Sequence, residues 1–157
     1  MSSELAELGL DRLSSERGDV TGIVMQRFYR AFPDARASFE HHGLNDVAGL
    51  EGRMVAESAF LLLQWSENPA IARIDHGTAV PHHNDTLKIG PHWYMGMVDA
   101  FLTVLLETIP GDAIEEYSYW NAMRDEIAGF FVSLREEFVL TDLGAEIPAK
   151  LETERFC

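Results

Sequence analysis

Two adjacent histidines, His82 and His83, stand between a phenylalanine-bearing corner and the start of an aromatic helix. The corner is Pro33–Phe39 and the helix start is Gly90–Tyr94. A neutral imidazole is a common axial ligand of haem iron, and a porphyrin also needs apolar walls on both of its faces. A corner phenylalanine, a histidine and a following aromatic helix supply these parts. The residues therefore predict a flat iron porphyrin wedged between helices.

The other four histidines are poorer candidates for the iron ligand: His41, His42, His76 and His92. The first two follow the corner, beside a glutamate, as ordinary polar residues of a turn. The third falls in a segment rich in helix breakers, and the last begins a helix and should face solvent. An arbitrary histidine pair is usually a solvated patch in a loop. The flanking aromatic motifs favour a ligand at His82 or His83 instead.

Composition and charge narrow the class of protein. At 157 residues, 46% hydrophobic and 24% charged, the chain predicts a single domain over residues 1–157 that is large enough to enclose a cofactor. Its net charge of −14 repels phosphate backbones and anionic lipids, so we expect neither nucleic acid nor a membrane as partner. The single cysteine, Cys157, excludes an internal disulfide and favours a reducing compartment. With no signal-like first segment and no long apolar run, we expect the protein in the cytoplasm.

Apolar residues recur at helical rather than alternating spacing, so we expect an all-α domain. The expected helices run from about Glu4 to Leu13, from Asp19 or Thr21 to a stop at Pro33, from Asp46 to Glu67, from Pro91 to about Glu107, and from Asp112 through Phe138. Residues 71–87 have a poor pattern with the breakers Gly77 and Pro81, which predicts the loosest segment. The apolar stripe of the last helix, from Ile114 to Phe138, must be buried against other helices. The tail from about residue 141 should be irregular.

These features resemble the globin superfamily, most closely the bacterial single-domain globins and globin-coupled sensors. In globins a proline closes the second helix, and a phenylalanine six residues later stacks on the haem. Pro33 and Phe39 have that spacing, and the stretch from Trp93 to Leu106 is similar to the penultimate globin helix. The resemblance covers roughly residues 21–131. It implies a globin-like fold, a 3-over-3 helical sandwich, that binds haem b.

The resemblance also implies a proximal histidine about ten residues before the tyrosine that matches Tyr94, but that position holds Asn84. One extra residue in the intervening loop makes His83 the iron ligand, with Ile89 following it by six residues. Two extra residues make His82 the ligand. We take His83 as the first choice and His82 as the second. The remaining alternatives are a ligand elsewhere in the chain or a globin fold without haem.

On the gas-binding side, the resemblance places Met25 where strongly oxygen-binding bacterial globins often carry tyrosine, and methionine offers only a soft sulfur. The candidates over the iron in the next helix are Glu51 with Val55, Leu50 with Met54, and Phe60. Tyr29 is the closest hydroxyl, although its matching position usually faces the core. None of these is an obvious neutral donor, so we expect a mainly apolar pocket.

Aromatic and apolar residues complete the expected site. Phe39 and Ile89 are expected as porphyrin walls, and Tyr94 as a neighbour of the haem that orients the ligating imidazole. Three tryptophans on apolar helical faces are explained by core packing: Trp65, Trp93 and Trp120. The expected cofactor-binding residues are Met25, Phe39, Val55, His83, Ile89 and Tyr94, and no catalytic residue is assigned.

Three functions are consistent with these residues. The leading hypothesis is a haem globin that reversibly binds oxygen, nitric oxide or carbon monoxide for sensing, storage or transport. A nitric oxide dioxygenase or peroxidase would need a separate reductase, because the chain has no flavin or nicotinamide motif. The third is a haem-free globin-like signalling module. The resemblance further implies a homodimer through the last two long helices, and a sensing role would require a signalling partner.

Overall fold

The computed structural model describes residues 2–87, 91–134 and 147–157, and the side chains of all of these except residues 2, 79–87 and 91. Within these ranges the chain forms seven α-helices, one short 3-10 helix and no strand, which confirms the predicted all-α class. The helices are α1 (Ser2–Arg17), α2 (Thr21–Ala31), α3 (Ala35–Gly43), α4 (Val47–Glu67), α5 (Pro69–Leu87), α6 (Pro91–Leu106), α7 (Ile114–Leu134) and η2 (Thr153–Phe156).

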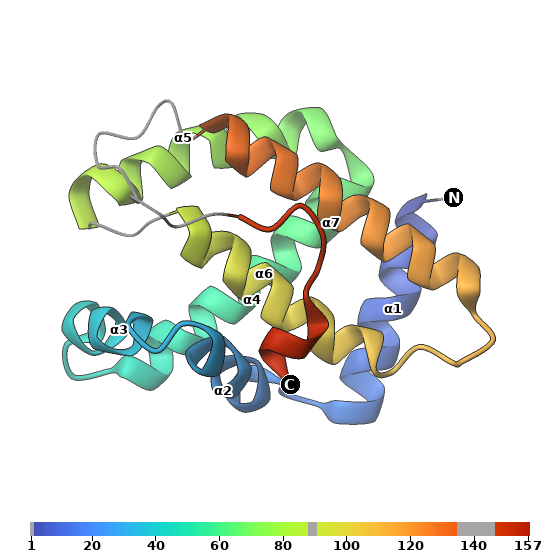
Figure 1. Cartoon of the computed structure of the whole chain (residues 1–157), viewed down its shortest axis with the longest axis horizontal. Helices are drawn as coiled ribbons and strands as arrows, with labels where there is room; N and C mark the ends of the chain where they lie inside the picture. Colours follow the sequence, from blue (N-terminus) through green and yellow to red (C-terminus); the bar gives the residue numbers. More distant parts are fainter. Residues whose placement is uncertain (1, 88–90, 135–146) are drawn as a thin grey trace.

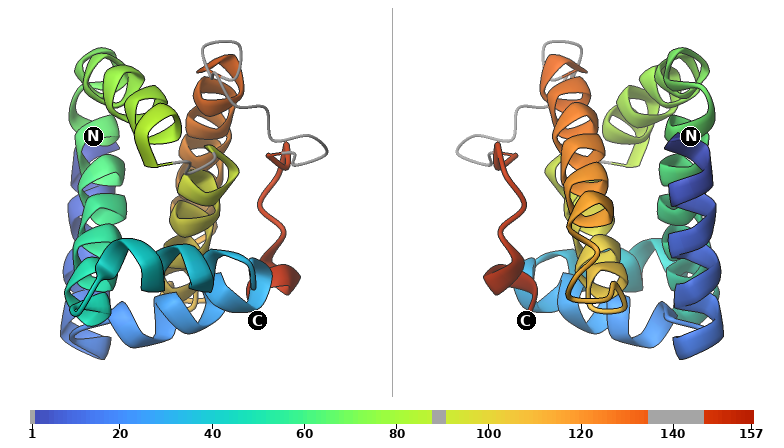
Figure 2. Two further views of the ribbon diagram at one scale, coloured as in Figure 1. Left: turned by 90° about the vertical axis from the view of Figure 1, so that its left-hand side faces the viewer. Right: turned by 90° about the vertical axis from the view of Figure 1, so that its right-hand side faces the viewer.

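Helices α4 and α6 occupy the middle of the molecule, with α5 and α7 on one side and α2 and α3 on the other (Figure 1). Helix α1 packs against α4, α6 and α7. The C-terminal segment crosses α6 and ends against α2, where η2 contacts both helices (Figure 2). Helix α6 is buried continuously from Met95 to Leu106, as expected for a helix that neighbours cover on all sides.

Local signals set several helix ends at their predicted positions. Asp19 Oδ1 accepts a hydrogen bond from the Thr21 amide at 3.0 Å, and Asp46 Oδ1 accepts one from the Gly49 amide at 3.0 Å. Pro91 is the first residue of α6. Helix α1 is longer than predicted at both ends, because no breaker interrupts it before residue 18, a glycine with a φ of 62°.

Residues 71–87 do not form the broken segment predicted from Gly77 and Pro81. Helix α5 runs through both positions and ends at Leu87. A proline removes one backbone hydrogen bond, and a glycine costs about 1 kcal/mol relative to alanine, but packing can offset both. Helix α5 packs against α4, α6 and α7. His82 and His83 therefore lie in a helix rather than in a loop.

The stripe of α7 is largely buried as predicted, with Tyr117 and Phe130 half-buried, but Ile114 is 72% exposed because it follows an exposed turn. Phe138 and the predicted start of the tail lie outside the described residues. The described part of the tail is more ordered than predicted, since η2 closes it and Phe156 is only 2% exposed. Trp65 and Trp120 are fully buried and Trp93 packs against the core, as predicted. Among the described residues, no helix has both the length and the apolar character needed to cross a membrane.

Helix α6 passes so close to α2 that Gly96 leaves no room for a side chain, because a Cβ atom there would overlap the ring of Phe32. That ring is also held from the C-terminal side, with the Arg155 guanidinium 4.5 Å and the Phe156 ring 6.3 Å from its centroid. We expect Gly96→Ala to lower the free energy of unfolding in urea by about 1–3 kcal/mol. Gly52→Ala is the control, because a Cβ there meets no atom within 4 Å, and it should be neutral or stabilising.

Candidate functional site

A small cavity lies where α4, α5, α6 and α7 meet. It is lined by Met54, Glu57, Ser58, Leu61, His76, Tyr94, Met97, Val98 and Phe131. Its volume is about 50 Å³. This space admits a water or a diatomic molecule but not a porphyrin. A porphyrin would also need the space bounded by residues 79–91, whose side chains lie outside the described set.

His76 brings an imidazole from α5 to this cavity. Its Nε2 lies 3.2 Å from Oε1 of Gln64 on α4, and the Gln64 amide nitrogen donates to Asp75 Oδ2 at 2.7 Å. Because that amide group is oriented by Asp75, its oxygen faces the imidazole and Nε2 carries the proton. Burial lowers the pKa of His76, and Glu57 and Asp75 offset this only in part. The ring is therefore neutral at neutral pH.

The lowered pKa of His76 predicts a pH dependence of stability. Since the folded pKa lies below the unfolded value of 6.5, the unfolded chain takes up the proton first as the pH falls. This contribution to stability is complete above about pH 6.5 and is lost progressively below it. We expect the free energy of unfolding of His76→Gln, measured in urea, to fall less than that of the wild type as the pH drops below about 6.5. An unchanged slope in H76Q would contradict this assignment.

Positions 82 and 83 lie on different sides of helix α5. Positions 76 and 83 are two helical turns apart and lie on the same side of the helix, whereas position 82 is rotated by about 120° from position 76. The side that carries His76 faces α4 and α6 across the cavity. The side chains of both histidines, and Ile89 altogether, lie outside what the structure describes.

Of the α4 residues considered for the site, some lie at the cavity or in the core and one lies in a different groove. Met54 lines the cavity, Val55 is 4% exposed, and Leu50 packs partly buried against the core. Phe60 does not line this cavity. It is 55% exposed and lines a different groove, between α1, α4 and α6, because it is rotated by about 200° from the cavity-lining Ser58.

Tyr29 connects α2 to α4 through Glu51. Its hydroxyl donates a hydrogen bond of 2.7 Å to Glu51 Oε2, and the Arg36 guanidinium carbon lies 4.2 Å from its ring centroid. Burial raises the pKa of the Tyr29 hydroxyl, and the hydrogen bond to Glu51 raises it further. The ring is buried, as its predicted core position requires. The bond fixes the Glu51 carboxylate and engages the only O–H of the tyrosine.

Met25 and Phe39 are buried but do not line the cavity. Met25 is 3% exposed in α2. Phe39 lies in α3, and its ring packs against those of Phe28 and Tyr29 at centroid distances of 5.8 and 5.7 Å. The structure thus brings Tyr94 together with Met54, a member of the predicted Leu50–Met54 pair. It places Phe39 in an aromatic cluster with Phe28 and Tyr29, and Met25 in the core.

Tyr94 is the predicted residue that the cavity includes directly. Burial raises the pKa of its hydroxyl, and the nearby carboxylate of Glu57 raises it further. Sequence reasoning missed His76, another polar residue of the wall, because its segment was taken as broken. Its spacing of seven residues from His83 was the signal that pointed to it.

Within the part of the chain that the structure describes, no group of three His, Cys, Asp or Glu side chains is arranged to hold a metal ion. A single imidazole does not retain iron without further ligands, which in haem the porphyrin nitrogens supply. Comparisons with protein-family models, with curated proteins and with solved structures found no match for this chain.

Proposed function

We propose that this protein is a haem-binding globin that reversibly binds a diatomic gas. The observation that supports the proposal is the register of α5, in which position 83 follows His76 by two turns on the same side of the helix. The packing of α5 and α7 on one side of α4 and α6, and of α2 and α3 on the other, supports a globin-like 3-over-3 sandwich. In this assignment His83 holds the iron through a neutral imidazole, and His82 is the second choice.

The walls of the haem site would come from several helices. Val55 and Met54 would face it from α4, Tyr94 from α6, and Ile89 from the chain just before α6. The buried residues Met25 and Phe39 would close the side formed by α2 and α3. When bound, haem would supply the iron that binds the diatomic gas.

The hydroxyl and carboxylate groups on α4 favour reversible binding over peroxide cleavage. Ser58 donates its hydroxyl to the Met54 carbonyl at 3.2 Å, and Glu51 accepts from Tyr29. Neither group is a donor directed at a gas ligand. Apolar side chains of Met97, Val98 and Phe131 line part of the cavity. A small neutral molecule is the ligand that such a space accepts.

Titration of the full chain with haemin tests the proposal. We expect a Soret band that saturates at one haem per chain and differs from that of free haemin. A protein that stays colourless contradicts the proposal and leaves a haem-free signalling module. The reduced protein in air should keep an oxygen complex. Rapid oxidation with consumption of nitric oxide would instead indicate a dioxygenase that works with a separate reductase.

A further inference from the structure

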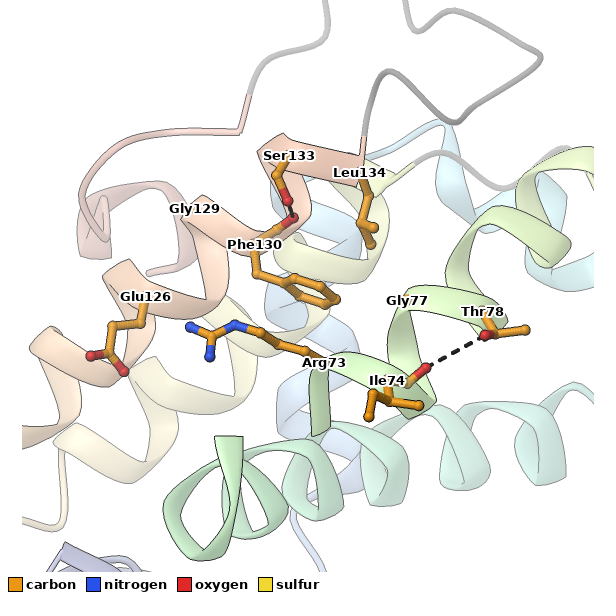
Figure 3. Close-up of a pocket in the computed structure, with 9 residues that line it drawn as sticks. All are labelled: Arg73, Ile74, Gly77, Thr78, Glu126, Gly129, Phe130, Ser133 and Leu134. Carbon is orange, nitrogen blue, oxygen red and sulfur yellow. Dashed lines mark hydrogen bonds between the residues drawn. The ribbon is translucent and has the colours of Figure 1, made fainter. Parts of the chain in front are cut away.

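An open groove of about 760 Å³ runs between α5 and α7 (Figure 3). Phe130 and Leu134 form its apolar floor. Gly77 and Gly129 leave a hollow, because neither carries a side chain. Beside the hollow Ile74 is 70% exposed, so one face offers both a projecting apolar side chain and a recess.

One end of the groove carries a cation and an anion on opposite walls. Arg73 stands on α5 and Glu126 on α7, as Figure 3 shows. Both are exposed, and both are positioned by Trp65. The guanidinium carbon of Arg73 lies 4.7 Å from the indole centroid, and Glu126 Oε2 accepts from Trp65 Nε1 at 3.1 Å. Within the described residues neither charge takes part in an ion pair, so each has capacity for a partner.

We propose that this groove is the contact face of a homodimer, in which Arg73 of one copy meets Glu126 of the other. A two-fold interface uses the same patch twice and must be self-complementary. This patch meets that condition in charge, with Arg73 and Glu126, and in shape, with Ile74 beside the recess at Gly129. A partner of different chemistry would not require both signs of charge on one patch.

The net charge of the chain supports this choice of face. Two copies of −14 repel one another at long range, so they approach best where positive and negative groups alternate. The face differs in part from the one that the globin resemblance implies, the last two long helices. Helix α6 is buried from Met95 to Leu106 and contributes no exposed surface there, which leaves α7 together with α5. The proposal does not depend on haem.

Sedimentation equilibrium of the full chain, with and without haem, tests the dimer. We expect the mass to rise from 17.6 kDa toward twice that value with concentration. Arg73→Glu and Glu126→Arg each set like charges opposite one another, and each should weaken dimerisation at least about tenfold. A mixture of the two variants should dimerise again, because each reversed charge then meets its opposite. That recovery requires contact between copies and is not explained by a local effect at Trp65.

Two further variants control for folding and shape. Glu115→Arg makes the same charge change at an exposed position of α7 outside the groove, and should leave the mass unchanged. Gly129→Trp should fill the recess and weaken the dimer without a clash, because a Cβ there meets no atom within 4 Å. A wild-type mass of 17.6 kDa at every concentration overturns the proposal. Equal dimerisation of wild type, R73E and E126R, or no recovery in the mixture, overturns it as well.

Discussion

Replacing His83 by alanine is expected to abolish tight haem binding. The proposed iron ligand is the imidazole at this position, two turns after His76 on the same side of α5. Loss of an outer-shell partner of a metal ligand already costs up to about a hundredfold in affinity, so loss of the ligand itself should cost at least about as much. Haemin titration followed at the Soret band measures the change. Far-ultraviolet circular dichroism verifies that the variant remains folded.

Two matched variants sharpen this expectation. His82→Ala changes the adjacent position, on a different side of α5, and should retain the Soret band. His76→Ala removes the imidazole two turns earlier on the same side, and should also retain it if the ligand is His83. Imidazole added to H83A should restore a haem band by occupying the vacated coordination position. A normal spectrum in H83A with loss of the band in H82A would assign the iron to His82.

The second large effect is expected at the ion pair between Asp99 on α6 and Arg124 on α7. Arg124 is 0% and Asp99 2% exposed, and two hydrogen bonds of 2.9 Å join their side chains. Burial raises the pKa of Asp99, and its bond to Arg124 acts in the opposite direction. Asp99→Ala leaves a buried cation with only part of its partners. We expect it to lower the free energy of unfolding by about 3–5 kcal/mol in guanidinium chloride.

Two comparisons separate this effect from simple loss of charge. Asp99→Leu combined with Arg124→Met removes both charges and should cost less than Asp99→Ala alone. Lys150→Ala breaks the exposed pair with Asp125 and should cost no more than about 1 kcal/mol. If D99A were as stable as K150A, Arg124 would not depend on Asp99. Arg124 Nη1 also donates to the Pro148 carbonyl at 2.8 Å, so D99A should loosen the C-terminal segment.

Helix ends were predictable where a residue acts on its immediate neighbours. The carboxylates of Asp19 and Asp46 cap amides two or three residues away, and Pro91 needs no amide partner at a helix start. The same local rules failed at Gly77 and Pro81, because they omit the packing that keeps α5 helical through both. Local chemistry therefore predicts boundaries better than it predicts continuity.

Site residues that follow one another at helical spacing could be predicted from the sequence. Contacts between residues on different helices could not. The pairing of Tyr29 with Glu51, or of Asp99 with Arg124, joins residues 22 or 25 positions apart on different helices, and no spacing in the sequence indicates either contact. Phe60 was considered as a wall residue because the sequence alone does not show which residues of α4 face the cavity formed with α5 and α6. The spacing between positions 76 and 83, in contrast, was present in the sequence.

The most direct measurement is the absorption spectrum of the purified chain after haem loading and reduction, before and after addition of carbon monoxide. If an imidazole of α5 holds the iron and leaves the opposite face for a gas, the Soret band should shift to that of a carbon monoxide complex and return when the gas is removed. A spectrum that does not respond to carbon monoxide, or that matches free haem throughout, would contradict the assignment of this protein as a gas-binding globin.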